Sequence, residues 1–291
     1  MCRHIVAPTP DDVFIGTAPL AFTFGLGGLL VFPFYAGACS VLNARYSPEK
    51  LLDAIDTYGA TVYFTVPTFF QQMVKLKTRQ CLATLRLAVS SGEALPLPVR
   101  QAWADATGLQ LAEVLGSTEM LHAFVGSAGQ DIRPRYIGPA IPGFDITVVD
   151  ETGNTLPANE IGRLAVRGPT GCRYLDDERQ TVYVQNGWNI TGDACSITQD
   201  GYLAYHSRLD DMIISSGYNI SGVEVENALL LHPDVRECAV VGEASEERGQ
   251  IVVAYVVTPV QGQHRSRLAG ELQDHVKTSI APYKYPRIVR F

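Results

Sequence analysis

Apolar and polar positions divide the chain into three regions with different patterns. Up to about Gly138, short apolar runs typical of buried strands alternate with patterns typical of amphipathic helices. The expected strands are Val13–Thr17, Ala38–Leu42, Thr61–Val66, Leu85–Ser90 and Leu109–Leu115, and the expected helices are Gly27–Tyr35, Pro48–Tyr58, Thr68–Lys75 and Leu97–Thr107. Ser47 before Pro48 is typical of a helix N-cap. Strands that alternate with helices predict a mostly parallel sheet covered on both faces.

The second region is β-rich, and the third mixes helices and strands. Short β runs at Ile146–Val149, Gly162–Arg167, Thr181–Val184 and Leu203–His206 are separated by turn residues and predict a barrel-like subdomain. From Asp210 the pattern predicts strands Met212–Ser215, Val235–Gly242 and Ile251–Val257 and helices Ser221–Leu231 and Arg267–Ile280. Ser221 and Glu224 form a potential capping box. We therefore expect an α/β fold with an α/β part (1–137), a β-rich part (138–209) and a small α+β domain (210–291).

Composition and charge indicate a folded protein that does not bind nucleic acid. Of the 291 residues, 46% are apolar and 18% charged, which is ordinary globular usage. A net charge of −7 gives no attraction to phosphate backbones or anionic lipid, so nucleic acid and membrane partners are not expected. The six cysteines are scattered without C-x-x-C spacing, which predicts reduced, mostly buried thiols in a cytoplasmic protein.

The segment from Gly16 to Asn43 carries no charged residue, and its length would suffice for a membrane span. Its prolines and glycines favour a different structure, in which a strand, a glycine turn, a short helix and a second strand are buried in the α/β core. Because proline and glycine are also tolerated in spans, membrane insertion stays open as an alternative on this evidence.

Two neighbouring strand ends carry small polar residues. Gly116-Ser117-Thr118-Glu119 follows one expected strand, and Ser91-Gly92-Glu93-Ala94 follows the one before it. Ligands of parallel sheets bind beyond the carboxyl ends of strands, where glycine lets the backbone approach, hydroxyls contact phosphate and a carboxylate can hold Mg²⁺. The first motif by itself is equally typical of a strand-to-helix turn with Thr118 as N-cap.

Two further motifs carry acidic residues. Asp193 follows a glycine turn in Gly187–Asp193 and could accept hydrogen bonds from a ribose diol, although a capped β-turn explains the same residues. Arg208-Leu209-Asp210-Asp211 lies where the third region begins, and there adjacent acids are also typical of solvated surface. The chain has no P-loop, no complete G-x-G-x-x-G and no G-x-S-x-G motif, which argues against P-loop kinases, Rossmann dehydrogenases and serine hydrolases.

The order and content of these motifs resemble the adenylate-forming superfamily of acyl-CoA synthetases, and within it the benzoate and 2-aminobenzoate CoA ligases. The resemblance covers essentially the whole chain. It implies ATP or AMP, Mg²⁺ and coenzyme A as cofactors, an aryl carboxylate as substrate, and a reaction that joins the acid to AMP before the CoA thiol displaces AMP. The demand for a metal and fixed donors follows from the charge that builds on the displaced phosphate.

The resemblance also implies roles for individual residues. Thr118 would contact the α-phosphate, Glu119 the Mg²⁺ and Asp193 the ribose, with Arg208 facing the nucleotide and Asp210 acting as the interdomain hinge. The adenine would be bordered by Gly92, Glu93 and Ala94, and Gly217 would flank the pantetheine tunnel. Gly116 and Ser117 complete the nucleotide motif. The acid pocket would be lined by Thr23, Phe24, Gly116, His122 and Ala123. The small Ala123 predicts tolerance of an ortho substituent, and a structural role for His122 stays open.

Departures from the family pattern predict impaired adenylation. The Gly-, Ser- and Thr-rich phosphate loop would precede the first residue, and the catalytic lysine would follow Phe291, so Lys284 is not that lysine and the chain is expected to be truncated at both ends. Leu115 stands where many relatives have an adenine-stacking aromatic residue. Apolar surface left exposed would favour self-association as a homodimer. An inactive adenylate-binding protein and an adenylating enzyme for another carboxylic acid stay open as alternatives.

Overall fold

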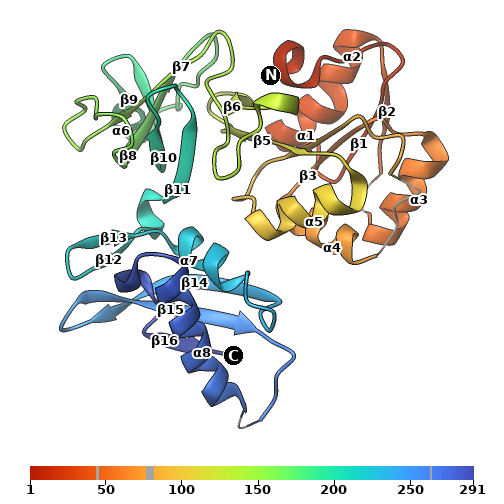
Figure 1. Ribbon diagram of the computed structural model, residues 1–291. Helices are drawn as coiled ribbons and strands as arrows, with labels where there is room; N and C mark the ends of the chain where they lie inside the picture. The colour runs from red at the N-terminus through yellow and green to blue at the C-terminus, as the bar shows by residue number, and fades with distance from the viewer. Residues whose placement is uncertain (44–45, 77–81, 263) are drawn as a thin grey trace. The chain divides into compact units, whose positions relative to one another are not determined.

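A computed structural model describes residues 1–43, 46–76, 82–262 and 264–291, and it divides into two compact units (Figure 1). Unit 1 contains Met1–Thr191 and Ser196–Tyr205, and unit 2 contains Gly192–Cys195 and His206–Phe291. The expected α/β class is confirmed, since one sheet is dominated by parallel strands and the other two contain antiparallel pairs. The three domain ranges expected from sequence stay predictions.

The main sheet of unit 1 has the order β2-β1-β3-β4-β5-β6. Its strands are β1 (Val13–Gly16), β2 (Cys39–Val41), β3 (Val62–Thr65), β4 (Leu87–Ser90), β5 (Leu111–Gly116) and β6 (Ala123–Gly126). The strands from β1 to β5 pair in parallel, while β6 runs antiparallel to β5. All five strands of the parallel part were expected from sequence, and β6 was not.

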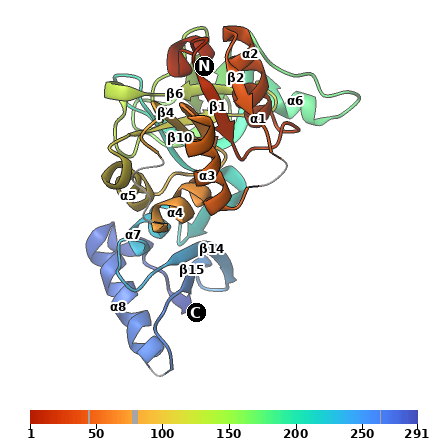
Figure 2. The same ribbon diagram turned by 90° about the vertical axis from the view of Figure 1, so that its right-hand side faces the viewer.

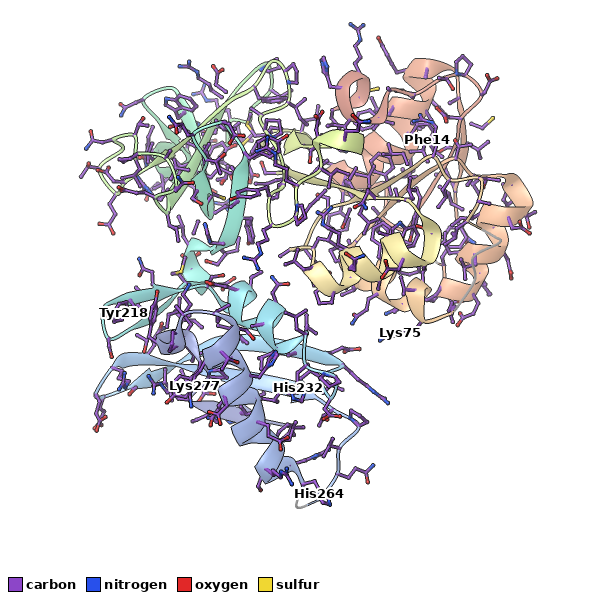
Figure 3. The ribbon with its side chains drawn as sticks, viewed as in Figure 1. Phe14, Lys75, Tyr218, His232, His264 and Lys277 are labelled. Carbon is purple, nitrogen blue, oxygen red and sulfur yellow. The ribbon has the colours of Figure 1, made fainter. Side chains whose placement is uncertain are left out.

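Helices cover both faces of this sheet. The helices are α1 (Thr23–Leu26), α2 (Phe32–Ala36), α3 (Pro48–Tyr58), α4 (Pro67–Lys75) and α5 (Leu97–Thr107), with π-helical turns at Cys2–Val6 and Gly27–Val31. One buried cluster joins α3, α4 and α5 to the face that carries Tyr63, and a second joins α2 and the first turn to the face that carries Phe14 (Figure 3). Ser47 caps α3 as expected, since its Oγ accepts from the Lys50 backbone N–H at 3.3 Å.

The β-rich part of the chain forms a sheet of order β11-β10-β8-β7, with β9 paired to β10. The strands are β7 (Asp145–Val149), β8 (Gly162–Arg167), β9 (Val184–Gln185), β10 (Trp188–Ile197) and β11 (Leu203–Arg208). The expected strand at Thr181–Val184 is wrong, because Arg179–Tyr183 forms helix α6. Its Gln180 side chain accepts a hydrogen bond from the Tyr174 backbone N–H at 2.7 Å, which fixes this turn to the preceding segment.

The sheet of unit 2 has the order β13-β12-β15-β14, with β16 pairing parallel to β15. The elements are β12 (Ile213–Ser215), β13 (Tyr218–Ile220), α7 (Gly222–Leu229), β14 (Glu237–Ser245), β15 (Gly249–Val257), α8 (His264–Ser279) and β16 (Ile288–Arg290). Residues of α7, α8 and β15 share one buried cluster, so both helices pack on one face of the sheet (Figure 2).

The start of α7 forms half of the expected capping box. The Ser221 Oγ accepts from the Glu224 backbone N–H at 3.2 Å, while the Glu224 carboxylate forms an ion pair with Lys284 instead of the reciprocal bond.

Two expectations about burial are corrected. Phe22, Phe34 and Tyr35 in the charge-free segment are 64%, 66% and 61% exposed, so one face of its helices is open rather than enclosed in the core. Of the five cysteines whose surroundings the structure describes, only Cys195 is buried, and Cys81 lies outside the described residues. Across the described ranges, no helix combines the length and the apolar character needed to cross a membrane.

Gly270 in α8 can be used to test how much the backbone freedom of a glycine in the unfolded chain lowers the stability of unit 2. It is exposed within the helix, and an added Cβ would meet no atom within 4 Å. We expect Gly270→Ala to raise the free energy of unfolding by about 0.5–1 kcal/mol, because alanine restricts the unfolded chain. Gly262→Ala is the control: its surroundings are equally open, but its φ of +63° disfavours a side chain, so denaturant titration should show a loss. Loss of stability in Gly270→Ala would contradict this account.

Candidate functional site

The loop after β4 lies at the carboxyl edge of the parallel sheet. Ser90 pairs with Glu113 of β5, so β4 and β5 end at the same edge. The Ser91 Oγ donates to the Val114 carbonyl at 2.9 Å and ties the start of the loop to β5. Gly92 has a φ of +89° and is exposed, as expected for a turn whose backbone can approach a ligand.

A buried ion pair holds the other end of this loop. The Leu95 backbone N–H donates to Glu113 Oε1 at 3.3 Å, and Arg100 of α5 forms an ion pair with Glu113 Oε2 at 2.5 Å. Arg100 also donates to the Leu111 carbonyl at 2.8 Å. Burial raises the pKa of Glu113, and the Arg100 guanidinium opposes that rise. The segment Gly92–Ala94 is thus flanked on both sides by residues that form hydrogen bonds with β5. Glu93 is exposed, and its carboxylate lies 3.4 Å from the Thr68 hydroxyl.

The turn that follows β5 joins two strands, so the alternative of a helix capped by Thr118 is wrong. The pairing register shifts between Leu115 and Gly116, where the backbone of the returning chain comes very close. A Cβ on Gly116 would lie 2.5 Å from the His122 carbonyl oxygen and 2.6 Å from Ala123 Cα. Ser117 Oγ accepts from the Met120 backbone N–H at 3.2 Å, leaving Thr118 exposed in the turn.

The segment before α6 packs on this turn, which sequence analysis did not anticipate. Thr170 Oγ1 donates to the Met120 carbonyl at 2.8 Å, and the Tyr174 phenol donates to Glu119 Oε1 at 2.8 Å. The bond to Glu119 raises the pKa of Tyr174 to about 12. Burial likewise raises the pKa of Tyr183, and a hydrogen bond with the Ser117 side chain opposes that rise. The contacts join residues about fifty positions apart, so no local pattern signals them.

Aromatic rings surround His122 on the other side of the turn. Its ring centroid lies 4.8 Å from that of Phe32 and 5.9 Å from that of Phe24, and Phe24 lies 5.4 Å from Phe64. Gly27 touches the imidazole so closely that a Cβ there would lie 2.3 Å from His122 Cδ2. The expected proximity of Phe24 and His122 is therefore present, and Thr23 begins the same short helix α1.

Burial keeps the His122 ring neutral, because it lowers the pKa to about 4. Nδ1 accepts from the Ala123 backbone N–H at 2.7 Å, so the proton resides on the buried Nε2, and a hydrogen bond with the Phe24 backbone opposes the fall in the pKa. Ala123 itself is 5% exposed and belongs to the core cluster with Phe14 and Phe64. Its role in substrate size selection stays a prediction.

The remaining residues that the sequence analysis assigned to the site belong to unit 2. Asp193 is buried within β10, and its carboxylate forms an ion pair with Arg208 at 2.9 Å. Gly192, with φ of +78°, gives the guanidinium space, since a Cβ there would lie 2.8 Å from one of its nitrogens. Asp210 is exposed in a 3₁₀ turn, and Gly217 is exposed with φ of +80° just before β13. In β13, Tyr218, which is labelled in Figure 3, stacks on Tyr283.

Metal binding at Glu119 would have to involve the nucleotide. The described residues hold no group of three or more His, Cys, Asp or Glu side chains able to bind a metal. Mg²⁺ in nucleotide sites is held by one or two carboxylates together with phosphates and water, so a single carboxylate fits Mg²⁺ and does not fit a metal held by protein ligands alone.

Comparison with known proteins gives consistent matches over the whole chain. Residues 1–173 match the family model described as AMP-binding enzyme, and residues 224–291 match that of the AMP-binding enzyme C-terminal domain. Acyl-coenzyme A synthetase ACSM4, mitochondrial, of Rattus norvegicus is 38% identical over 99% of this chain and 52% of its own length. Benzoate–CoA ligase of Thauera aromatica is 34% identical over 99% of this chain and 56% of its own length.

A solved structure agrees closely with the fold. The anthranilate CoA ligase AuaEII in complex with anthranoyl-AMP superposes with a TM-score of 0.90 at 33% identity, covering all of this chain and 57% of that one. The chain spans about half the length of the curated relatives it matches.

Proposed function

Because the chain belongs to the AMP-binding enzyme family, which includes AMP-forming acyl-CoA synthetases, we propose that it serves the activation of an aryl carboxylate, benzoate or 2-aminobenzoate, and its transfer to coenzyme A. A carboxylate oxygen of the acid attacks the α-phosphorus of ATP and pyrophosphate leaves. The CoA thiol then loses its proton, attacks the acyl carbon and displaces AMP.

The cluster of Phe24, Phe32, Phe64 and His122 beside the Gly116–Glu119 turn is the observation that carries this proposal. Phe32 and Phe64 are buried in the core, so a flat aryl acid would stack on the half-buried Phe24 and His122. An acid with a free ammonium group would need a carboxylate partner there. Neutral His122 supplies a polar edge without placing a charge against the ring.

The turn residues would handle the phosphates. Ser117 and Thr118 present hydroxyls next to a backbone that Gly116 leaves open, and Glu119 presents the carboxylate. Mg²⁺ bound there with the phosphates would neutralise the charge of the departing pyrophosphate. Asp193 and Arg208 would contact the ribose and the phosphate, Gly92–Ala94 would border the adenine, Asp210 would act as hinge, and Gly217 would flank the pantetheine of CoA.

Activation of a non-aromatic acid is the second candidate, since the acyl-coenzyme A synthetases matched at up to 39% identity are not described as aryl-specific. Cytoplasmic location and a homodimer stay predictions.

Calorimetric titration of the folded chain with a non-hydrolysable 2-aminobenzoyl-adenylate mimic tests the proposal. We expect saturable binding at least about tenfold tighter than that of a matched alkyl-adenylate. The two mimics share the adenylate and differ only in the acyl group, so the difference in affinity measures the contribution of the aryl ring. The benzoyl-adenylate mimic should differ in affinity from the 2-amino form by no more than about 200-fold, since small volume differences are worth roughly 1–3 kcal/mol. Tighter binding of the alkyl mimic would favour the second candidate, and no binding of either by the folded chain would contradict both.

A further inference from the structure

We propose that Tyr174 is a positioning residue for Glu119: its phenol fixes the carboxylate in the orientation in which it would hold Mg²⁺ together with nucleotide phosphates. This inference rests on the proposed function, because it assigns a supporting residue to the same site. Tyr174 would not touch substrate, and it would act through Glu119 alone.

The contact is specific and spans a long loop. The Tyr174 hydroxyl donates to Glu119 Oε1 at 2.8 Å, within the normal range for a hydrogen bond to an ionised acceptor. The same segment is anchored a second time, where Thr170 Oγ1 donates to the Met120 carbonyl at 2.8 Å. Two bonds to adjacent residues fix both the backbone and the side chain of the turn.

Tyr174 is itself held in place from three sides. Its backbone N–H donates to Gln180 Oε1 at 2.7 Å, its ring meets that of Tyr183 edge-on with centroids 5.6 Å apart, and the Arg179 guanidinium lies 4.8 Å above it. Arg179 is in turn paired with Asp177 at 2.6 Å. A phenol held this firmly offers a fixed donor, so Glu119 loses little further freedom when it binds a ligand.

Orientation matters for this ion in particular. Mg²⁺ demands near-ideal octahedral geometry and tolerates little displacement of its ligands. Partners that orient a metal ligand typically change metal affinity by about 10–100-fold when they are removed. If the Tyr174 hydroxyl orients the carboxylate for Mg²⁺, the effect of removing it should depend on the presence of the ion, whereas the effect of losing a purely structural bond should not.

Tyr174→Phe removes the hydroxyl and keeps the ring, and Tyr202→Phe is the matched control. The Tyr202 ring also forms an edge-on pair, with Tyr136, and its hydroxyl donates one hydrogen bond, at 3.1 Å to the Asp131 carbonyl, which has no part in the candidate site. Binding of α,β-methylene-ATP to the full chain would be measured by calorimetry with Mg²⁺ and with EDTA. We expect Tyr174→Phe to weaken binding about tenfold with Mg²⁺ and by less than about twofold in EDTA. Tyr202→Phe should match the wild type in both.

The possible outcomes separate this inference from the proposed function. No binding by the folded wild-type chain, or binding that Mg²⁺ does not strengthen, would contradict the metal role of Glu119 and remove the basis for both. Mg²⁺-dependent binding that is unaltered in Tyr174→Phe would overturn the role of Tyr174 alone. An equal loss with Mg²⁺ and in EDTA would show a merely structural bond and overturn it as well.

A second variant keeps the test decisive if Tyr174→Phe does not fold. Gln180→Ala retains the phenol and removes only the acceptor for the Tyr174 backbone N–H. It should weaken Mg²⁺-dependent binding in the same direction, and unchanged Mg²⁺ dependence would then overturn the inference.

Discussion

Replacing Arg100 with methionine is expected to lower the free energy of unfolding by about 3–5 kcal/mol at pH 7, because Glu113 would be left as a buried charge without its partner. The side chains of Arg100 and Glu113 are 7% and 13% exposed, so water cannot substitute for the lost ion pair. Urea denaturation of both proteins gives the difference.

The loss should depend on pH with a definite sign. Burial raises the pKa of Glu113 above the ordinary 4.5, and removing Arg100 raises it further. A group whose pKa is higher in the folded state favours folding below its unfolded pKa and opposes it as pH rises through the folded pKa. The deficit of Arg100→Met should therefore shrink as pH falls from 7 towards 4.5.

The double variant Arg100→Met/Glu113→Gln is the control, since it removes both charges. It should recover part of the stability lost in the single variant. A deficit that is the same at pH 7 and pH 5, or a double variant no more stable than the single, would contradict the assignment of a charged Glu113.

Gly116→Ala is expected to cost about 3 kcal/mol of stability and to abolish binding of the aryl-adenylate mimic. The added Cβ would lie 2.5–2.7 Å from three backbone atoms of His122 and Ala123, and backbone cannot move aside as a flexible side chain can. The strain falls on the turn that carries Ser117 and Glu119.

Gly171→Ala serves as the matched control in the same unit. Its Cβ would meet only the Asn189 side chain, at 3.8 Å, which is an ordinary contact. Thermal unfolding and calorimetry should find this variant close to the wild type. Adenylate binding that survives in Gly116→Ala would show that the turn is not part of the site.

The fold was predictable where local chemistry and burial agree. Helices Pro48–Tyr58 and Leu97–Thr107 have the expected bounds, because a proline in the first turn and a glycine after the last define each end. A strand was wrongly predicted at Thr181–Val184 because its β-branched residues are typical of strands. Helix α6 forms there instead, and Gln180 and Tyr183 both contact Tyr174. β6 was missed because the alternation of strands and helices favoured a helix after the Gly116–Glu119 turn, whereas the chain returns antiparallel to β5.

The sequence predicted which turns belong to the candidate site, but it did not predict the long-range contacts between their side chains. Motif order identified Gly116–Glu119 and the Phe24 segment, since both keep their residues close together in sequence. Tyr174 and Glu113 act through bonds to residues far away or on another element, and a single sequence gives no sign of such pairs.

The strand order of unit 1 also governs how it must fold. β1 lies between β2 and β3, so Phe14 pairs with Val62 across one crossover, and β3 pairs with β4 across a further crossover. Each of these pairings closes a loop of tens of residues, and the entropy of closure is lost before the strands compensate for it. We therefore expect this unit to fold more slowly than a domain built from local contacts. We also expect the amide hydrogens of β3 and β4, whose residues are all buried, to exchange with solvent only when the sheet opens as a whole.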